Sequence, residues 1–518
     1  MSKFNTATAR PSGTSPIVSE NTPSGRTHEG ADGYTRDTKS ELFLLAVSNM
    51  VGERTFYESA ASRDDRYEQL IRAVAVADPE WTGHFLRWLR TEGNLRSASL
   101  VGALEAAKAM LGAKVPGSRA IVADVLQRAD EPGEALAYWT SRYGRTIPKP
   151  VKRGVADAVL RLYTERSLLK YDTASKGFRF GDVIDLVHPV ADVSWRGDLF
   201  KFALDRRHGR GEEIPESLEM ILHNDLVRAT AAEDPVVLLN ADRLKLAGLT
   251  WEDALSLAGS KVDKARLWEA LIPTMGYMAL LRNLRNFDQA GVSDEVATQV
   301  AARLADPEQV AKSRQFPFRF LAAYRNAPSL RWGHALDRAL TASLSNVPEL
   351  LGRTLVLVDR SGSMFGRMSE KSELTSADAA AVFGSALALR NVGRVDLVEF
   401  GNSSRVIDVK FGDSLLRTVD RFTNLGGTET LAAVRRHYAG HDRVLIVTDE
   451  QAWASYGDPG SAIPANVPLY TWNLLGYRHG HGPSGSRHRH TFGGLTDAAF
   501  RMVPLLEAGR SGRWPWSE

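Results

Sequence analysis

The spacing of apolar residues changes near residue 350, and this change constrains the fold of the chain more than any other feature. Between about residues 40 and 346, apolar residues recur three and four positions apart in short segments separated by Pro, Gly and Asp. From residue 354 onwards, continuous apolar runs alternate with helical patterns. We therefore expect two architectures in succession, a helical one followed by a mixed one.

The first part predicts a HEAT-like α-solenoid. Many short amphipathic helices, with no strict repeat period, can bury their apolar faces only against neighbouring helices. The spacing is clearest at residues 67–77, 82–91, 97–111, 151–165, 195–206, 264–270 and 294–304. The aromatic residues Trp81, Phe85 and Trp88 share one helical face, so we expect them in the core and not in a base-stacking platform.

The second part predicts a doubly wound α/β domain. Residues 354–358 form an apolar, β-rich run of the kind found in buried parallel strands. Further strands are expected at residues 395–400, 405–409, 444–448 and 469–475, and helices at 374–390, 415–421, 429–437 and 498–507. In such domains ligands bind at the carboxyl ends of the strands.

Five residues with side-chain oxygens follow the predicted strands of this domain. Asp359, Ser361 and Ser363 come directly after the first strand. Thr428 follows two glycines before a helix, and Asp449 follows the strand at 444–448. Such an oxygen-only set suits a hard divalent cation, Mg²⁺ first, with Mn²⁺ or Ca²⁺ as alternatives. A turn that only caps a helix would explain the first three residues but not the whole set.

This set resembles the metal-ion-dependent adhesion site of von Willebrand A-type domains. The resemblance implies that Ser361, Ser363 and Thr428 ligate the metal. It also implies that Asp359 and Asp449 act largely through water or the serine hydroxyls, and that one position stays open for an acidic group of a partner. No histidine lies near the motif in sequence, and the chain has neither a phosphate-binding loop nor a nucleophile elbow. We therefore expect no catalytic residues and no enzyme.

Composition restricts the remaining function classes. The chain has 518 residues and no cysteine, which excludes disulfides and thiolate metal sites and fits a reducing compartment. It has no apolar run long enough to span a membrane and no secretory signal, so we expect a cytoplasmic protein without a membrane partner. The net charge of +3 neither requires nor excludes a nucleic acid, so any basic surface must be found locally.

Several segments, taken in order with the metal motif, resemble the Ro autoantigen family, whose helical part is the TROVE module. The segments are residues 43–46, 52–57, 147–154, 169–171, 182–189 and 278–286. The resemblance covers about residues 38–507 and implies a ring of HEAT-like helix pairs closed by the A-type domain. It also implies a small noncoding Y-like RNA on an outer basic face, single-stranded 3′ ends of defective RNAs in a central hole, and a ribonuclease as a partner.

Two basic clusters support an RNA partner. Such stripes can neutralise phosphates, although a solvated helix face is the ordinary alternative. The candidate residues in these clusters are Lys149, Lys152, Arg153 and Lys170 in the first and Arg206 and Arg207 in the second. By motif position in the resemblance, Lys170 and His188 are the best candidates for RNA contacts.

We expect a disordered tail at residues 1–35, because it is rich in Gly, Pro, Ser and Thr and lacks leucine. The RNA-binding helical domain should cover residues 36–348, the A-type domain residues 349–508, and a second tail residues 509–518. His479, His481, His488 and His490 should lie in a flexible, partly cationic loop without a ligand role. The leading functional hypothesis is an RNA-binding scaffold, and the alternative is a metal-dependent protein-interaction adaptor that does not bind RNA directly.

Overall fold

The computed structural model describes residues 13–48, 51–210, 213–327, 329–370, 372–453 and 457–517. The chain divides into two compact units. The helical unit comprises residues 71–309 and 326–335. The A-type unit comprises the described residues of 1–70, 310–325 and 336–518, so it contains segments from both ends of the chain.

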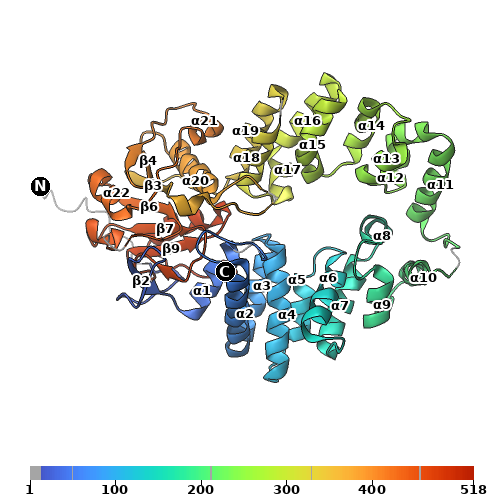
Figure 1. Cartoon of the computed structure of the whole chain (residues 1–518), viewed down its shortest axis with the longest axis horizontal. Helices are drawn as coiled ribbons and strands as arrows, with labels where there is room; N and C mark the ends of the chain where they lie inside the picture. Colours follow the sequence, from blue (N-terminus) through green and yellow to red (C-terminus); the bar gives the residue numbers. More distant parts are fainter. Residues whose placement is uncertain are drawn as a thin grey trace, which may run out of the picture. The chain divides into compact units, whose positions relative to one another are not determined.

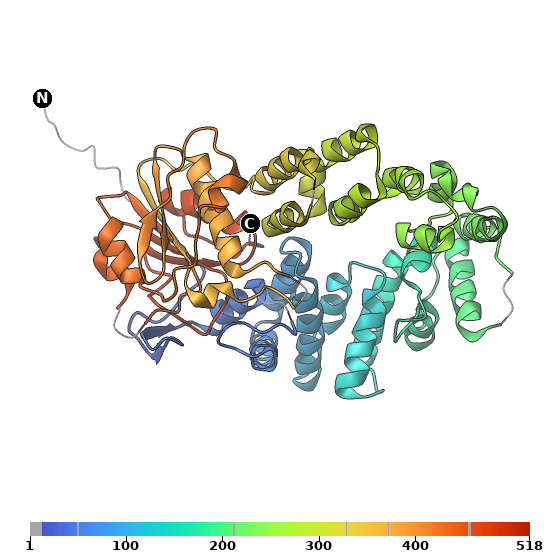
Figure 2. The same cartoon turned by 45° about the horizontal axis from the view of Figure 1, so that its top comes forward.

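The helical unit is a row of helices that pack mainly on their neighbours in sequence (Figures 1 and 2). Helix α4 packs on α3 and α5, α5 packs on α7, and α9 packs on α10, which is the nearest-neighbour pattern of a HEAT-like α-solenoid. The fold predicted for this part is confirmed. Its elements are α3 (Pro79–Thr91), α4 (Arg96–Gly112), α5 (Ser118–Val125), α6 (Glu131–Tyr143), α7 (Lys149–Leu162), α8 (Glu165–Tyr171), α9 (Phe180–Val187), α10 (Ser194–His208), α11 (Glu219–Glu233), η1 (Pro235–Leu239), α12 (Ala241–Leu246), α13 (Trp251–Ala258), α14 (Lys264–Leu271), η2 (Ile272–Thr274), α15 (Tyr277–Ala290), α16 (Asp294–Ala305) and η3 (Leu330–Trp332). Four helices have residues in both units: α2 (Ala60–Ala77), α17 (Pro307–Ser313), α18 (Pro317–Asn326) and α19 (Gly333–Ser343).

Capping residues set where these helices begin. The Asp78 carboxylate accepts a hydrogen bond from the backbone N–H of Trp81 (3.0 Å) at the start of α3, and Pro79 occupies the first helical position. The helix predicted at 151–165 is α7, which ends at Leu162. The next helix, α8, begins at Glu165, because the Thr164 hydroxyl caps it by accepting a hydrogen bond from the backbone N–H of Ser167 (3.2 Å). Trp81 and Phe85 are buried and stack at 5.0 Å, as predicted for a core face.

The A-type unit is organised around a six-stranded sheet of order β5-β4-β3-β6-β7-β9. All neighbours pair in parallel except β5, which is an antiparallel edge strand. The strands are β3 (Thr354–Asp359), β4 (Val395–Phe400), β5 (Ser404–Val406), β6 (Arg443–Thr448), β7 (Leu469–Asn473) and β9 (Arg489–Gly493). The helical elements of this unit are α1 (Thr38–Ser48), η4 (Gly362–Phe365), α20 (Ser376–Arg390), α21 (Leu415–Val419), α22 (Thr430–His437), η5 (Pro459–Ala462), η6 (Asp497–Arg501) and α23 (Met502–Glu507).

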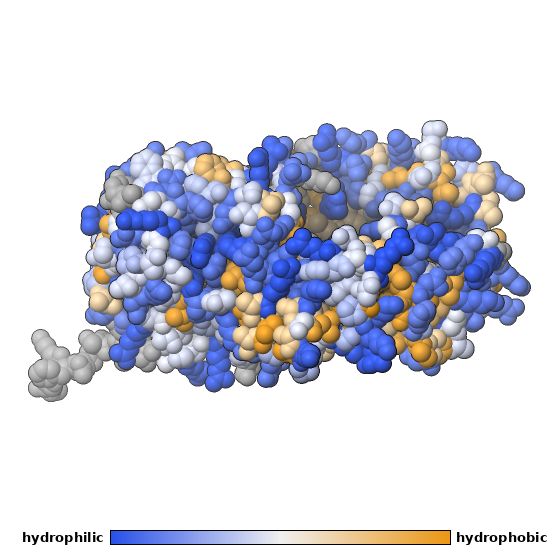
Figure 3. Space-filling view, turned by 60° about the horizontal axis from the view of Figure 1, so that its bottom comes forward, coloured by the Kyte–Doolittle hydropathy of each residue, from blue (hydrophilic) through white to orange (hydrophobic). Residues whose placement is uncertain are grey.

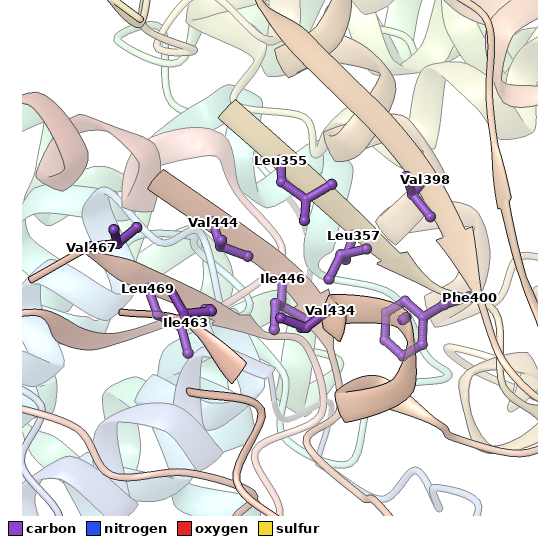
Figure 4. Packing of buried hydrophobic residues seen from close by; sticks show 11 residues of the cluster. Leu355, Leu357, Val398, Phe400, Val434, Val444, Ile446, Ile463, Val467 and Leu469 are labelled. Atoms are coloured by element: carbon purple, nitrogen blue, oxygen red, sulfur yellow. The ribbon is translucent and has the colours of Figure 1, made fainter. Parts of the chain in front are cut away.

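Both faces of this sheet are covered. Leu355 and Leu357 of β3 belong to a buried cluster that includes Val434 of α22, and Figure 4 shows how these side chains meet. Val358, one position on, contacts the opposite helix α20 at Gly384, where a Cβ would clash with its side chain. Successive side chains of β3 thus point to opposite faces of the sheet, and both faces are buried. The predicted doubly wound domain is therefore confirmed.

Residues 13–35 are ordered, so the prediction of a disordered tail at 1–35 is wrong for them, while residues 1–12 lie outside the described part. Strand β1 (Gly25–Arg26) pairs with β2 (Asp32–Thr35), and β2 pairs with β8 (His479–Gly480). Some backbone hydrogen bonds of this segment are internal, and others are made with distant residues, as from Ser19 to Ser484 (3.1 Å) and from Ala31 to Ala452 (3.3 Å). The composition of the segment alone therefore does not decide its order.

Residues 509–517 of the predicted C-terminal tail form no helix or strand, but they contact the A-type unit. The backbone N–H of Gly512 donates to the carbonyl of Thr14 (2.7 Å), and the ring of Trp514 lies 5.3 Å from that of Phe43. The first and last parts of the described chain therefore contact each other within the A-type unit.

The histidine-rich segment forms strands and is not a flexible cationic loop. His479 lies in β8 and His490 in β9, and the side chains of His481 and His490 are buried. Burial lowers the pKa of His481, and it lowers the pKa of His490 to about 4. His481 and His490 are therefore neutral at pH 7.

Among the described residues, no helix has the length and the apolar character that a membrane span requires. The face drawn in Figure 3 is mostly hydrophilic, with hydrophobic residues gathered in smaller patches.

Candidate metal centre and basic surface

The first three residues of the predicted metal set meet at the carboxyl end of β3. Asp359 is the last residue of the strand, and its Oδ1 accepts a hydrogen bond from the backbone N–H of Ser361 (2.8 Å). Its Oδ2 accepts one from Thr448 Oγ1 (2.5 Å), at the end of the neighbouring strand β6. The hydroxyl oxygens of Ser361 and Ser363 lie 3.1 Å apart. The loop thus turns two hydroxyls towards the end of the sheet.

The loop that carries Thr428 is held against the same segment. The backbone N–H of Gly362 donates to the carbonyl of Gly426 (2.5 Å). Gly426 has a φ of +79°, and a Cβ at Gly427 would lie 2.9 Å from the ring of Trp453. Glycine is therefore required at both positions. This close approach places the buried Thr428 next to the loop of the two serines.

Asp449 completes the set from the end of β6. Its Oδ1 accepts a hydrogen bond from the backbone N–H of Gln451 (2.9 Å), whereas its Oδ2 is buried without a hydrogen-bond partner. Burial and the nearby Asp359 carboxylate raise the pKa of Asp449 well above its usual range, and burial also raises the pKa of Asp359. A divalent cation would compensate the negative charge of these two buried carboxylates and would give the Asp449 Oδ2 a partner. The residues therefore fit the group that the A-type fold implies.

Three residues of the N-terminal segment of the A-type unit lie near this site, and no pattern in the sequence indicated them. The hydroxyl of Tyr57 donates a hydrogen bond to the Glu29 carboxylate, and Asp449 and Ser363 are among the groups that influence its pKa, which burial raises most. The ring of His28 stacks on that of Tyr57 at 4.9 Å. Glu29 and His28 lie in the predicted tail, and no spacing in the sequence connects residue 29 with residue 363.

The first basic cluster is not neutralised by carboxylates of the described chain. Lys149, Lys152 and Arg153 lie on α7 at i, i+3 and i+4, and Lys170 lies on α8 above the ring of Tyr171 (5.1 Å). All four are exposed or partly exposed, and none forms an ion pair with a carboxylate of the described chain. The opposite face of α7 is buried against α5, where Gly154 allows close contact.

The second basic cluster is largely neutralised within the protein. Arg206 and Arg207 of α10 pair with Asp172 (3.6 Å) and Asp182 (2.7 Å). These pairs hold α10 against α9 and the preceding segment. His188 is exposed and ends α9 with a φ of +49°, directly before Pro189. Of the six basic residues predicted in the two clusters, Lys149, Lys152, Arg153 and Lys170 thus lack a carboxylate partner in the described chain, whereas Arg206 and Arg207 have one.

Comparisons with known proteins agree with this architecture. Residues 211–332 match the TROVE domain, a range that contains the segment 278–286. The "RNA-binding protein RO60" of Deinococcus radiodurans is 26% identical over 476 residues, which cover 85% of each chain. The crystal structure of the Deinococcus radiodurans Ro (RSR) protein matches with a TM-score of 0.61 and 21% identity, over 91% of this chain and 100% of that one. Telomerase protein component 1 of Mus musculus is 45% identical over 83 residues, only 3% of its length.

The fold defines a class of protein in which a helical-repeat array is followed by a von Willebrand A-type domain. Within that class the chain is similar to the Deinococcus radiodurans Ro protein in sequence and fold, and its residues 211–332 match the TROVE domain.

Proposed function

We propose that this Ro-like chain is an RNA-binding scaffold. The observation that carries the proposal is the set of four basic side chains on α7 and α8 that lack carboxylate partners in the described chain. Such cations keep their full charge for phosphates, and their contacts release counterions from the RNA. The TROVE match and the relative named as an RNA-binding protein support the same class of partner.

The RNA that we propose for this surface is a small noncoding Y-like RNA, with Lys170 and His188 among its contacts. A second mode would take single-stranded 3′ ends of defective RNAs, which a partner ribonuclease would then mature or degrade. The two modes differ in what determines binding. The first depends on backbone charge and weakens steeply with salt, whereas the second requires a free, unpaired end.

A competition gel with a structured RNA and an RNA with a 3′ overhang tests this proposal. Lys149→Glu with Lys152→Glu should weaken binding of the structured RNA by about 1–3 kcal/mol and reduce its salt dependence. Lys170→Glu with His188→Ser should act in the same direction. The matched control is Arg243→Glu with Lys245→Glu, two exposed cations on α12. An equal loss in the control, or no loss in either test variant, would contradict the proposed surface.

We also propose that the site of Asp359, Ser361, Ser363, Thr428 and Asp449 binds Mg²⁺, or Mn²⁺ in its place, in a structural or adhesive role without turnover. The buried Asp449 Oδ2 without a partner supports this proposal. Asp359→Ala with Ser361→Ala should abolish Mn²⁺ binding in calorimetry. It should leave RNA affinity nearly unchanged, because the basic residues lie in the helical unit.

Two outcomes would change this assignment. Protein that binds metal but no RNA at low salt would favour the adaptor hypothesis, in which the site captures a partner's carboxylate. RNA cleavage or nucleotide hydrolysis that disappeared with Asp449→Ala would contradict the absence of turnover.

A further inference from the structure

A small cavity of the A-type unit is lined by the loop before α2 and by the loop that follows β3. Its volume of about 30 Å³ gives room for roughly two water molecules, so it can hold a small polar group but not an aromatic ring. Of the five residues in the proposed metal set, only Ser363 is among its described lining residues. The charged side chains that line it are Glu53, Arg54, Arg63 and Arg367.

The two loops are joined to each other, and each carries one exposed arginine of the cavity wall. In the loop before α2, the backbone N–H of Thr55 donates to the carbonyl of Glu58 (2.9 Å), which closes a turn. In the loop after β3, the backbone N–H of Glu370 donates to the carboxylate of Glu53 in the first loop (3.0 Å). These hydrogen bonds hold the two loops, and therefore the backbones of both arginines, in place around the cavity.

The cavity carries more positive charge than the described chain neutralises. Arg54 and Arg367 are exposed, and neither forms an ion pair with a carboxylate of the described chain. Arg63 is buried and paired with Glu58 (3.0 Å), so it contributes no free charge. Glu53, the only acid among the described lining residues, offsets one of the two free arginines. The cavity therefore favours an anion, and planar guanidinium groups match the oxygens of a phosphate.

An exposed aromatic ring lines the same cavity. Phe56 is 59% exposed, and its ring meets that of Tyr57 edge-on, with 4.9 Å between the centroids and 78° between the planes. A single exposed phenylalanine is common on protein surfaces and is not by itself a site. Beside two unpaired arginines, however, it completes the set of groups that hold a nucleotide, namely cations for the phosphate and an aromatic ring for the base.

We propose that this cavity binds one nucleotide. Arg54 and Arg367 bind the phosphate group, which is small enough to enter the cavity, and the base stacks outside it on Phe56. The site lies in the A-type unit, so it is separate from the cations of α7 and α8 and does not depend on the RNA surface proposed there. Both a free nucleotide and the end of an RNA strand offer this chemistry, a phosphate next to a base.

Binding of AMP, adenosine and inorganic phosphate to the full-length chain tests the proposal, with EDTA present so that no divalent ion contributes. Calorimetry should show AMP binding at least about tenfold more tightly than adenosine or phosphate, because each of these makes only part of the contacts. Arg54→Gln with Arg367→Gln should weaken AMP binding at least about tenfold and leave adenosine binding unchanged. Phe56→Leu should weaken AMP binding about fivefold and leave phosphate binding unchanged.

The matched control is Arg435→Gln with Arg436→Gln, because both arginines are exposed on α22 and form no ion pair in the described chain. This control should bind AMP like the parent. An equal loss in the control, or no loss in the variant of Arg54 and Arg367, would overturn the proposal. Equally tight binding of phosphate and AMP, with no effect of Phe56→Leu, would overturn it as well, since the cavity would then bind any small anion.

Competition between AMP and an adenosine trinucleotide with a 5′-phosphate distinguishes the two sources of the nucleotide. A trinucleotide that displaces AMP at an equal or lower concentration would support an RNA end as the ligand. Displacement only at about tenfold higher concentration would support a free nucleotide, because the added chain then hinders binding. Lys149→Glu with Lys152→Glu should leave AMP binding unchanged, so this site and the RNA surface of the helical unit can be refuted separately.

Discussion

At the scale of single residues, the buried Oδ2 of Asp449 has no hydrogen-bond partner. We expect it to lower the stability of the metal-free protein and to stabilise the metal-bound protein. Burial and the Asp359 carboxylate raise the pKa of Asp449, so its ionised form is disfavoured in the fold. Asp449→Asn should therefore raise the melting temperature without metal. The parent should gain about 2.7 kcal/mol at a Mg²⁺ concentration one hundred times its dissociation constant, and the variant should gain none. Thermal melts with and without Mg²⁺ check this. A variant that still gained stability with Mg²⁺ would contradict the role of Asp449.

A second prediction at this scale concerns the buried His490. Its pKa in the fold is about 4, whereas that of a free histidine is 6.5. The unfolded chain therefore binds more protons below pH 6.5, so stability should be full above pH 6.5 and fall as the pH drops towards 4, by about 3 kcal/mol for this group. His490→Phe, which keeps a ring stacked on Tyr470, should flatten the profile in that range. Denaturant unfolding from pH 4 to pH 7.5 gives the comparison. Identical profiles for both proteins would show that His490 does not titrate as expected.

The same residues show how far the sequence could predict the site. Asp359, Ser361, Ser363, Thr428 and Asp449 could be found because the carboxyl ends of adjacent parallel strands lie together in any doubly wound sheet. Glu29 and Tyr57 could not, because their positions depend on tertiary packing with residues more than 300 positions away. Free and paired cations also look alike in a sequence, which is why Arg206 and Arg207 could not be distinguished from Lys149 and Lys152.

At the scale of elements, the contact between α5 and α7 depends on one glycine. A Cβ at Gly154 would lie 2.6 Å from the carbonyl oxygen of Arg119 in α5, a backbone atom that cannot move alone. Gly154→Ala should therefore destabilise the protein by about 1–3 kcal/mol, despite the better helix propensity of alanine. Gly112→Ala in α4 is the matched control, because no atom lies within 4 Å of its Cβ position, and it should be neutral or slightly stabilising. Urea unfolding gives the free energy of unfolding of both variants and so distinguishes packing from helix propensity. Equal changes in Gly154→Ala and Gly112→Ala would rule out the packing argument.

Elements differ in how well the sequence predicts them. Strand β3 was predictable from its continuous apolar run at residues 355–358, because a strand buried on both faces is apolar along most of its length. Strand β9 was not, because Arg489, His490 and Thr491 are polar and the strand is formed by pairing with β7. Polar residues at its start made the segment resemble a loop, and only the neighbouring strand determines its conformation.

At the scale of the whole molecule, an ion pair between residues 414 positions apart joins the N-terminal segment to the A-type domain. Arg36 and Glu450 are both buried, and Asn473 also donates a hydrogen bond to Glu450. The segment therefore reaches its final position only after the A-type domain has been synthesised and folded. A tail predicted from local composition is ordered here by the last third of the chain.

This pairing predicts a large effect of Arg36→Leu on the stability of the A-type unit. Removing the guanidinium leaves the Glu450 carboxylate buried without its cation, which should cost about 3–5 kcal/mol. Arg26→Leu is the control, because the Arg26–Asp32 pair is exposed, and it should cost less than about 1 kcal/mol. Arg36→Leu with Glu450→Gln should recover part of the loss, since the unpaired charge is then gone. Calorimetric unfolding of the four proteins measures these differences. Equal losses in Arg36→Leu and Arg26→Leu would mean that the segment does not depend on the buried pair.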